Sequence, residues 1–338
     1  MKRPRVLVID DSAFARMVLA RLMRASGRID VVAVARDVEE GLESIAALDP
    51  DVVTLDLTMP GTDGLAVLRA LHGRSRPRVI VVSSSTIDTE IGAEALALGA
   101  IDLIAKPTAL PSDQLFEIGD DLVAKVLAVA DSEGATIPVT EPALADGKPV
   151  ARAALVMIGT STGGPQALSL LLASLPVTLA SPIAIVLHIP EGYTEALARR
   201  LNKASPLDVV EAEDGMELRP GLAIVARGGL HLLIERDGLG LRARLGARTV
   251  RPFTPSVDEL FSSGADAVGA GALGVVLTGM GDDGLAGARA IVAAGGSLLT
   301  ESASTCVVYG MPRCVDEARL GACSIPIGGM AEEIIRRV

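Results

Sequence analysis

The chain has 338 residues, of which 49% are hydrophobic but only 2% aromatic, and a formal net charge of −11. This length suits two domains, and a core of Ala, Val, Leu and Ile suits parallel strands covered by helices. The negative charge would repel a phosphate backbone, so we expect no nucleic-acid partner. No run reaches the roughly 18 apolar residues of a membrane span, and the chain starts with a predicted strand instead of a signal peptide. Three cysteines without metal-site spacing fit reduced thiols, so we expect a cytoplasmic protein without direct membrane insertion.

In the first part of the chain, short β-branched runs alternate five times with stretches of helical period. Such a series predicts a (βα)5 doubly wound α/β domain over residues 1–131. Strands are expected at 5–9, 30–33, 52–55, 78–82 and 102–104, and helices at 13–26, 38–48, 64–73, 88–98 and 113–131.

Over 132–150 the alternation of strand and helix patterns ends, and the sequence is rich in Ser, Glu, Thr, Pro, Asp and Gly, which predicts a linker. A second α/β domain is expected over 151–338, with a mainly parallel sheet. The stretch 207–250 looks like hairpins, which predicts a β-hairpin insertion. Strands are expected near 153–158, 183–187, 207–212, 221–226, 230–235, 239–244, 273–278 and 296–300, and helices near 164–174, 193–203, 255–268, 283–294 and 330–337.

Carboxylates follow the predicted strands of the first domain. Asp10 and Asp11 come after the first strand and Asp56 after the third, and these strand ends meet at one sheet edge. Three acids there would repel one another unless a hard cation such as Mg²⁺ bridged them. Ser83 and Lys106 end the next strands, as a phosphorylated aspartate would require. Simple helix capping explains any one of these residues, but not all five.

The second domain carries Gly-Thr-Ser-Thr-Gly at 159–163, between a predicted strand and a predicted helix. A serine on such a turn has an exposed hydroxyl, as a nucleophile requires. The loop also resembles a dinucleotide fingerprint, with Ser161 in place of the second glycine. The acid that such a site needs about 20 residues later is missing, and His188 follows the next strand instead. A P-loop is excluded because its motif does not occur.

A nucleophilic serine needs a base and a group that orients the base. His188 would emerge at the same sheet edge as Ser161, whereas His72 is expected on the surface and His231 in a half-exposed structural role. The strand near 273–278 runs into a Gly-rich turn, whose N–H groups could form an oxyanion hole while Asp282 or Asp283 reaches the histidine. Asp283 could also be a plain helix N-cap.

The first domain resembles the receiver domain of bacterial response regulators. The resemblance rests on Asp-Asp-Ser at 10–12, Leu-Asp-Leu-Thr-Met-Pro at 55–60 with the glycine at 64, Val-Ser-Ser at 82–84, and Lys-Pro at 106–107. It implies a metal site and a phosphorylated aspartate, and a cis peptide at 106–107. Leu103 departs from the family, which often has an aromatic residue there. The implied roles are phosphoacceptor for Asp56, metal-site acids for Asp10 and Asp11, carbonyl ligand for Thr58, and phosphoryl contacts for Ser83 and Lys106.

The second domain resembles the chemotaxis protein-glutamate methylesterase family, CheB, over nearly its whole length. The matching segments are 158–164, 188–194, Pro-Ser-Val-Asp at 255–258, 277–281 with 283–284, and 310–312. Asp282 departs from the family, which often has a neutral residue there. The implied roles are nucleophile for Ser161, base for His188, orienting acid for Asp283, hydroxyl partner of the histidine for Thr162, and oxyanion donor for the Met280 N–H.

The resemblance implies a phosphorylation-activated response regulator that hydrolyses glutamyl methyl esters, and deamidates glutamines, on chemoreceptors. The expected partners are a histidine kinase as phosphodonor and methylated chemoreceptors as substrate, and the receiver is expected to shield the active-site face. The expected cofactor is Mg²⁺ in the receiver and none for the esterase chemistry. Two rivals stay open: a receiver with a DNA-binding output, which lacks a basic recognition helix here, and an interaction module whose esterase residues are vestigial.

Overall fold

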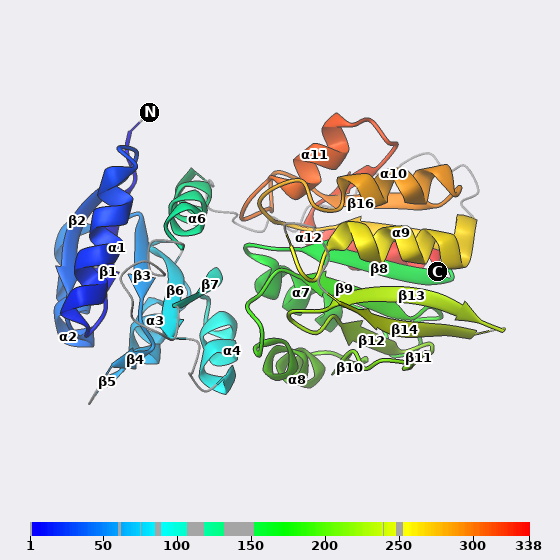
Figure 1. Cartoon of the computed structure of the whole chain (residues 1–338), viewed down its shortest axis with the longest axis horizontal. Helices are drawn as coiled ribbons and strands as arrows, with labels where there is room; N and C mark the ends of the chain where they lie inside the picture. Colours follow the sequence, from blue (N-terminus) through cyan, green and yellow to red (C-terminus); the bar gives the residue numbers. More distant parts are fainter. Residues whose placement is uncertain are drawn as a thin grey trace. The chain divides into compact units, whose positions relative to one another are not determined.

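The computed structural model describes residues 2–59, 62–74, 76–84, 89–106, 118–131, 152–238, 240–247 and 253–338. The chain divides into two compact units, Met1–Gly134 and Ala135–Val338 (Figure 1). The segment 132–150, predicted as a linker, lies outside the described residues.

The first unit is built on a parallel sheet in the order β2-β1-β3-β6-β7. The strands are β1 (Arg5–Ile9), β2 (Asp30–Ala35), β3 (Val52–Leu55), β6 (Arg78–Ser84) and β7 (Asp102–Lys106). The strand order reverses between β1 and β3, which is where ligands bind in open α/β sheets. The predicted doubly wound α/β class is confirmed, and a short antiparallel pair, β4 (Thr58–Met59) with β5 (Thr62–Asp63), is an addition.

Helices cover both faces of this sheet. α1 (Ala13–Ala25) and α6 (Gly119–Asp131) contact each other on one face, and α2 (Val38–Leu48), α3 (Leu65–Leu71) and α4 (Thr89–Ala97) form the row on the other (Figure 1). The first five residues of the helix predicted at 113–131 lie outside the described residues.

The second unit contains a seven-stranded parallel sheet in the order β10-β12-β9-β8-β15-β16-β17. Every residue of the central strand β8 is buried, as expected for a parallel sheet whose two faces are both covered by other elements. The strands are β8 (Leu155–Thr160), β9 (Ile183–Leu187), β10 (Asp208–Glu211), β12 (Leu222–Val225), β15 (Ala272–Val276), β16 (Ser297–Glu301) and β17 (Cys323–Ile325).

The prediction of hairpins throughout 207–250 is wrong in part. β10 and β12 are parallel neighbours in the main sheet. Only β13 (His231–Asp237) and β14 (Gly240–Gly246) form a hairpin, and β11 (Glu217–Leu218) pairs with β14. A short apolar run does not reveal its partner strand, so periodicity cannot separate these arrangements. The sequence analysis also missed α11 (Met311–Glu317) and β17, because both are short and lack a strong hydrophobic period.

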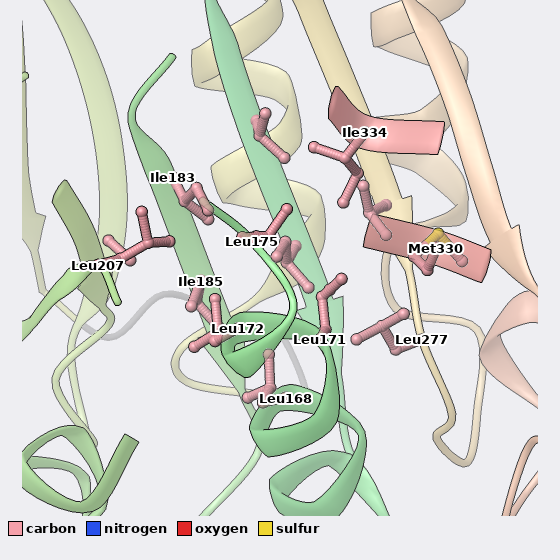
Figure 2. Packing of buried hydrophobic residues seen from close by; sticks show 14 of the residues in the cluster. Leu168, Leu171, Leu172, Leu175, Ile183, Ile185, Leu207, Leu277, Met330 and Ile334 are labelled. Carbon is pink, nitrogen blue, oxygen red and sulfur yellow. The ribbon is translucent and has the colours of Figure 1, made fainter. Parts of the chain in front are cut away.

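The helices of the second unit form two layers. α7 (Gly164–Ala173), α8 (Thr194–Ala204) and α12 (Ile327–Arg337) cover one face of the sheet, while α9 (Val257–Val268), α10 (Leu285–Ala293), α11 and the hairpin cover the other (Figure 1). A short 3-10 turn, η1 (Gly269–Gly271), precedes β15. Among the described residues, no helix is long and apolar enough to span a membrane. Figure 2 shows part of the first layer's core, in which leucines of α7 pack against Ile183, Ile185, Met330 and Ile334.

Candidate active site and phosphorylation site

The structure brings four predicted residues of the first unit together at the carboxyl ends of the strands. The Lys106 Nζ lies 2.6 Å from Asp10 Oδ2 and 2.5 Å from Asp56 Oδ2. The Ser83 hydroxyl donates to Asp56 Oδ1 at 2.8 Å. Asp56 is therefore held between a hydroxyl and an ammonium group, while its backbone N–H donates to the Ile9 carbonyl at 2.9 Å.

The electrostatics of this cluster leave negative charge uncompensated. Burial raises the pKa of Asp10 above its ordinary value, and the nearby Lys106 only partly offsets this effect. Burial alone would lower the pKa of Lys106, but Asp10 and Asp56 outweigh it and raise that pKa. Two carboxylates pair with one ammonium group and the third, that of Asp11, lies close to them, so a divalent cation would be stabilised here.

The donor set fits Mg²⁺. Carboxylate oxygens of Asp10, Asp11 and Asp56 all lie within 4.8 Å of one another. Mg²⁺ prefers oxygen ligands and usually keeps several bound waters. Asp11 is exposed, which leaves room for such waters. The ion would neutralise charge on a transferred phosphoryl group. The Thr58 N–H donates to Asp56 Oδ1 at 3.1 Å, while its role as a carbonyl ligand remains a prediction. The peptide at 106–107, predicted to be cis, lies outside the described residues.

Mg²⁺ is expected to raise the free energy of unfolding of the whole chain. A tenfold excess over the dissociation constant adds about 1.4 kcal/mol by mass action. Asp11→Asn removes one charged ligand and is expected to weaken binding by at least about tenfold. Calorimetric titration and thermal melts with Mg²⁺ measure both effects. The matched control is Asp30→Asn, another exposed aspartate of this unit, and equal affinity in both variants would contradict the assignment.

Two further residues shape this site: Arg16, which was not assigned from sequence, and Gly64, which the sequence analysis named only as part of the receiver motif. Arg16 on α1 donates to the carbonyl of Asp10 at 2.6 Å and to that of Asp11 at 2.9 Å, which fixes the acidic loop. A Cβ on Gly64 would lie 2.6 Å from the Asp56 carbonyl oxygen, so only glycine permits this approach. The usable signal for Arg16 was its place one helical turn after the Asp-Asp-Ser motif.

In the second unit, the loop after β8 presents Ser161. The Thr278 carbonyl accepts the Ser161 N–H at 3.1 Å and the Thr160 hydroxyl at 2.7 Å. Gly163 has a φ of +82°, a left-handed conformation that glycine adopts without strain. A Cβ on Gly159 would lie 2.2 Å from Val257 Cγ1. Both glycines of the motif are thus explained by backbone geometry and packing.

His188 lies beside this loop, as the sheet register dictates. Leu187 of β9 pairs with Thr160 of β8, and the His188 N–H donates to the Thr160 carbonyl at 3.2 Å. Its imidazole Nε2 lies 2.8 Å from Asp283 Oδ2. The ring stacks on Phe253 with centroids 4.3 Å apart and planes inclined by 7°. Sequence reasoning missed Phe253, because nothing in its local pattern indicated this contact.

Within the described residues, the buried Nδ1 of His188 has no hydrogen-bond partner. The Ser161 hydroxyl, with the residue 8% exposed, likewise makes no hydrogen bond there. Nδ1 is therefore the nitrogen left to accept a proton. Thr162 is buried and its carbonyl accepts the Thr278 hydroxyl at 2.9 Å, while its predicted contact with the histidine stays a prediction.

Asp283, and not the exposed Asp282, is the carboxylate that reaches the histidine. It also accepts the Ser256 hydroxyl at 2.9 Å and the N–H groups of Val257 and Asp258 at 2.7 and 3.0 Å. Burial by itself raises the pKa of Asp283, but the hydrogen bonds from His188 and from these N–H groups outweigh it and hold the pKa below its ordinary value. This carboxylate is thus kept ionised beside the imidazole.

The Gly-rich turn after β15 touches the serine loop directly. A Cβ on Gly279 would lie 2.9 Å from Ser161 Cβ, so the two backbones are in contact. The Met280 N–H donates to no acceptor among the described residues. The preceding Thr278 N–H donates to the buried carboxylate of Glu301 at 2.8 Å, and burial raises the pKa of Glu301. Sequence analysis missed Glu301, which ends β16 and anchors the turn.

The two other histidines lie apart from this chemistry. His72 is exposed at the end of α3. The prediction that His231 is half-exposed is wrong, since it is 2% exposed. Its Nδ1 accepts the Ser256 N–H at 3.2 Å, so it supports the residue that binds Asp283. The hairpin packs on α9, which buries this strand face.

The folds and sites define a protein of two α/β units: the first carries a cluster of acidic residues around a lysine, and the second carries a histidine–aspartate pair beside a serine loop. The CheB methylesterase model matches residues 156–334, and the response regulator receiver domain model matches residues 6–117. The chain belongs to the CheB methylesterase family, and its first unit is a response regulator receiver domain.

Two relatives match along nearly their whole length. The chain is 54% identical to protein-glutamate methylesterase/protein-glutamine glutaminase 5 of Myxococcus xanthus, over 99% of this chain and 98% of that protein. It is 38% identical to protein-glutamate methylesterase/protein-glutamine glutaminase 3 of Geobacter sulfurreducens, over 100% and 98%. The crystal structure of the Thermotoga maritima CheB methylesterase catalytic domain covers 55% of this chain and 99% of its own, with 36% identity and a TM-score of 0.53.

Proposed function

We propose that this protein hydrolyses glutamyl methyl esters, and deamidates glutamines, on methyl-accepting chemoreceptors, and that phosphorylation of Asp56 activates it for adaptation in chemotaxis-like signalling. The observation that carries the proposal is the His188–Asp283 pair beside the Ser161 loop, in a chain of the CheB methylesterase family. The proposed domain bounds are 1–131 for the receiver, 132–150 for the linker and 151–338 for the esterase.

The proposed chemistry is acyl transfer through Ser161. His188 Nδ1 takes the hydroxyl proton as Oγ attacks the ester carbonyl carbon, and Asp283 stabilises the imidazolium through Nε2. The Met280 N–H faces the oxyanion. Collapse breaks the bond to the methoxy group, which takes the proton from His188 and leaves as methanol. Water, deprotonated by His188, then attacks the acyl carbon; the bond to Ser161 Oγ breaks, Oγ takes the proton back from His188, and the glutamate side chain is released. A glutamine substrate releases ammonia in place of methanol by the same steps.

The proposed regulation places a phosphoryl group from a histidine kinase on Asp56. Lys106 and Ser83, already in contact with the carboxylate, would bind the phosphoryl oxygens. Asp10, Asp11 and Asp56 would hold Mg²⁺. Activation of the esterase then requires a difference in free energy between two states of the chain of about 1 to 3 kcal/mol.

Methanol release from a methylated chemoreceptor preparation, with and without Mg²⁺ and acetyl phosphate, tests both parts. We expect the rate to rise with the phosphodonor because Asp56 becomes phosphorylated. Asp56→Ala is expected to release methanol at the unstimulated rate in both conditions, while Asp30→Ala, which alters an exposed aspartate, keeps the stimulation. Absence of methanol under every condition would exclude the esterase assignment for this substrate.

A further inference from the structure

Two buried carboxylates join the first turn of α9 to the first turn of α10. Asp283 accepts the N–H groups of Val257 and Asp258, the first two residues of α9. Asp258 in turn accepts, on Oδ1, the N–H of Gly284 at 2.9 Å and of Gly287 at 2.8 Å, at the start of α10. Each helix is therefore capped by a carboxylate that the other element carries.

Neither helix has a cap of its own. The N-cap residues Ser256 and Gly284 make no side-chain hydrogen bond to their own helix. The first N–H groups of a helix need acceptors, and the positive end of the helix dipole stabilises an anion placed there. Asp283 at the start of α9 and Asp258 at the start of α10 each supply an acceptor for these N–H groups and a negative charge near the helix dipole.

The two helices are in close contact at this point. They lie side by side in Figure 1. A Cβ on Gly287 would lie 2.5 Å from Phe261 Cβ and 3.0 Å from the Asp258 carbonyl oxygen. This contact leaves little freedom to the turn that connects Met280 to Gly287. The position of the Asp283 carboxylate thus depends on how α9 holds the start of α10.

The exchanged hydrogen bonds of Asp258 and Asp283, here called the clamp, include the Asp283 oxygen that faces His188. Asp283 Oδ2 binds both the Val257 N–H and His188 Nε2. Asp258 holds Gly284, the residue next to Asp283, by accepting its N–H. We propose that Asp258 is a positioning residue of the esterase reaction, which keeps Asp283 aligned with His188. This inference deepens the function proposed above and rests on it.

Steady-state methanol release by Asp258→Ala and Asp258→Asn of the full chain tests the proposal. Alanine removes the acceptor for both N–H groups, so kcat is expected to fall about tenfold or more with KM within about twofold. The acidic limb of the pH profile is expected to shift to lower pH, because a misaligned Asp283 stabilises the imidazolium less. Asparagine keeps an oxygen acceptor and is expected to retain kcat within about threefold.

Ser181→Ala is the matched control for lost stability. The Ser181 hydroxyl is buried and donates to the Ala153 carbonyl, before β9 at the amino end of the sheet, far along the strands from Ser161 and His188. If Asp258→Ala changes kcat and the pH profile no more than Ser181→Ala does, the positioning role is overturned. A wild-type chain that releases no methanol would instead overturn the proposed function.

Should Asp258→Ala fail to fold, Asp258→Asn and Asp258→Glu decide the question. Glutamate keeps the charge but moves the acceptor by one methylene, so the clamp predicts an active asparagine variant and an impaired glutamate variant with unchanged KM. The reverse order, or equal activity of the two variants, would overturn the proposal.

Discussion

Ser161→Ala is expected to lower methanol release by at least about 10⁴-fold, because the variant has no nucleophile and retains only binding and oxyanion stabilisation. The free energy of unfolding should stay within about 0.5 kcal/mol of wild type, since the hydroxyl makes no hydrogen bond within the described residues. Methanol assays and denaturant titrations measure the two quantities.

Ser169→Ala serves as the control for this change. Ser169 lies on α7, the helix that follows the serine loop, and its hydroxyl donates to the Pro165 carbonyl. It should keep full activity. Residual activity of Ser161→Ala near the wild-type rate would mean that another group attacks the ester.

Asp283→Asn is expected to reduce kcat by about 10⁴-fold, because a neutral amide does not stabilise the imidazolium and favours the wrong tautomer of His188. Asp282→Asn makes the same chemical change one residue earlier, at an exposed side chain without a contact to His188. It is expected to keep kcat within about threefold. Equal losses in both variants would rule out Asp283 as the orienting acid.

The effect of Asp283→Asn on the free energy of unfolding is also expected to depend on pH. The pKa of Asp283 is held below its ordinary value, so its carboxylate stabilises the folded state above the unfolded pKa of about 3.9, and this stabilisation is lost as pH falls through the lower folded pKa. Asp283→Asn should therefore be less stable than wild type at pH 7, and the difference should shrink in acid. Denaturant titrations at pH 7 and pH 3 measure it.

The strands and acidic residues of the receiver were largely predictable, because short sequence patterns indicate both. β1 and β3 were placed with their observed bounds, and the acids that follow them had to meet at one edge of a parallel sheet. Arg16 was not predictable, because its contact with two carbonyl groups depends on how α1 is seated on the sheet.

The esterase site was predictable only in part. Ser161 and His188 follow adjacent strands, and the choice between Asp282 and Asp283 came from family resemblance because both follow the same turn. Phe253, Ser256 and Glu301 were missed as site residues, since their partners lie far along the chain. The strand pairing within 207–250 failed for the same reason.

The sequence by itself determined the two α/β units, the family and the strand ends that carry Asp56, Ser161 and His188, because these follow from periodicity and short motifs. Only the tertiary structure decided which oxygen faces His188, which N–H groups hold it in place, and that Asp258 and Asp283 cap each other's helices. The physical reason is that hydrogen-bond geometry between distant segments is set by helix packing and sheet register, which no local pattern encodes.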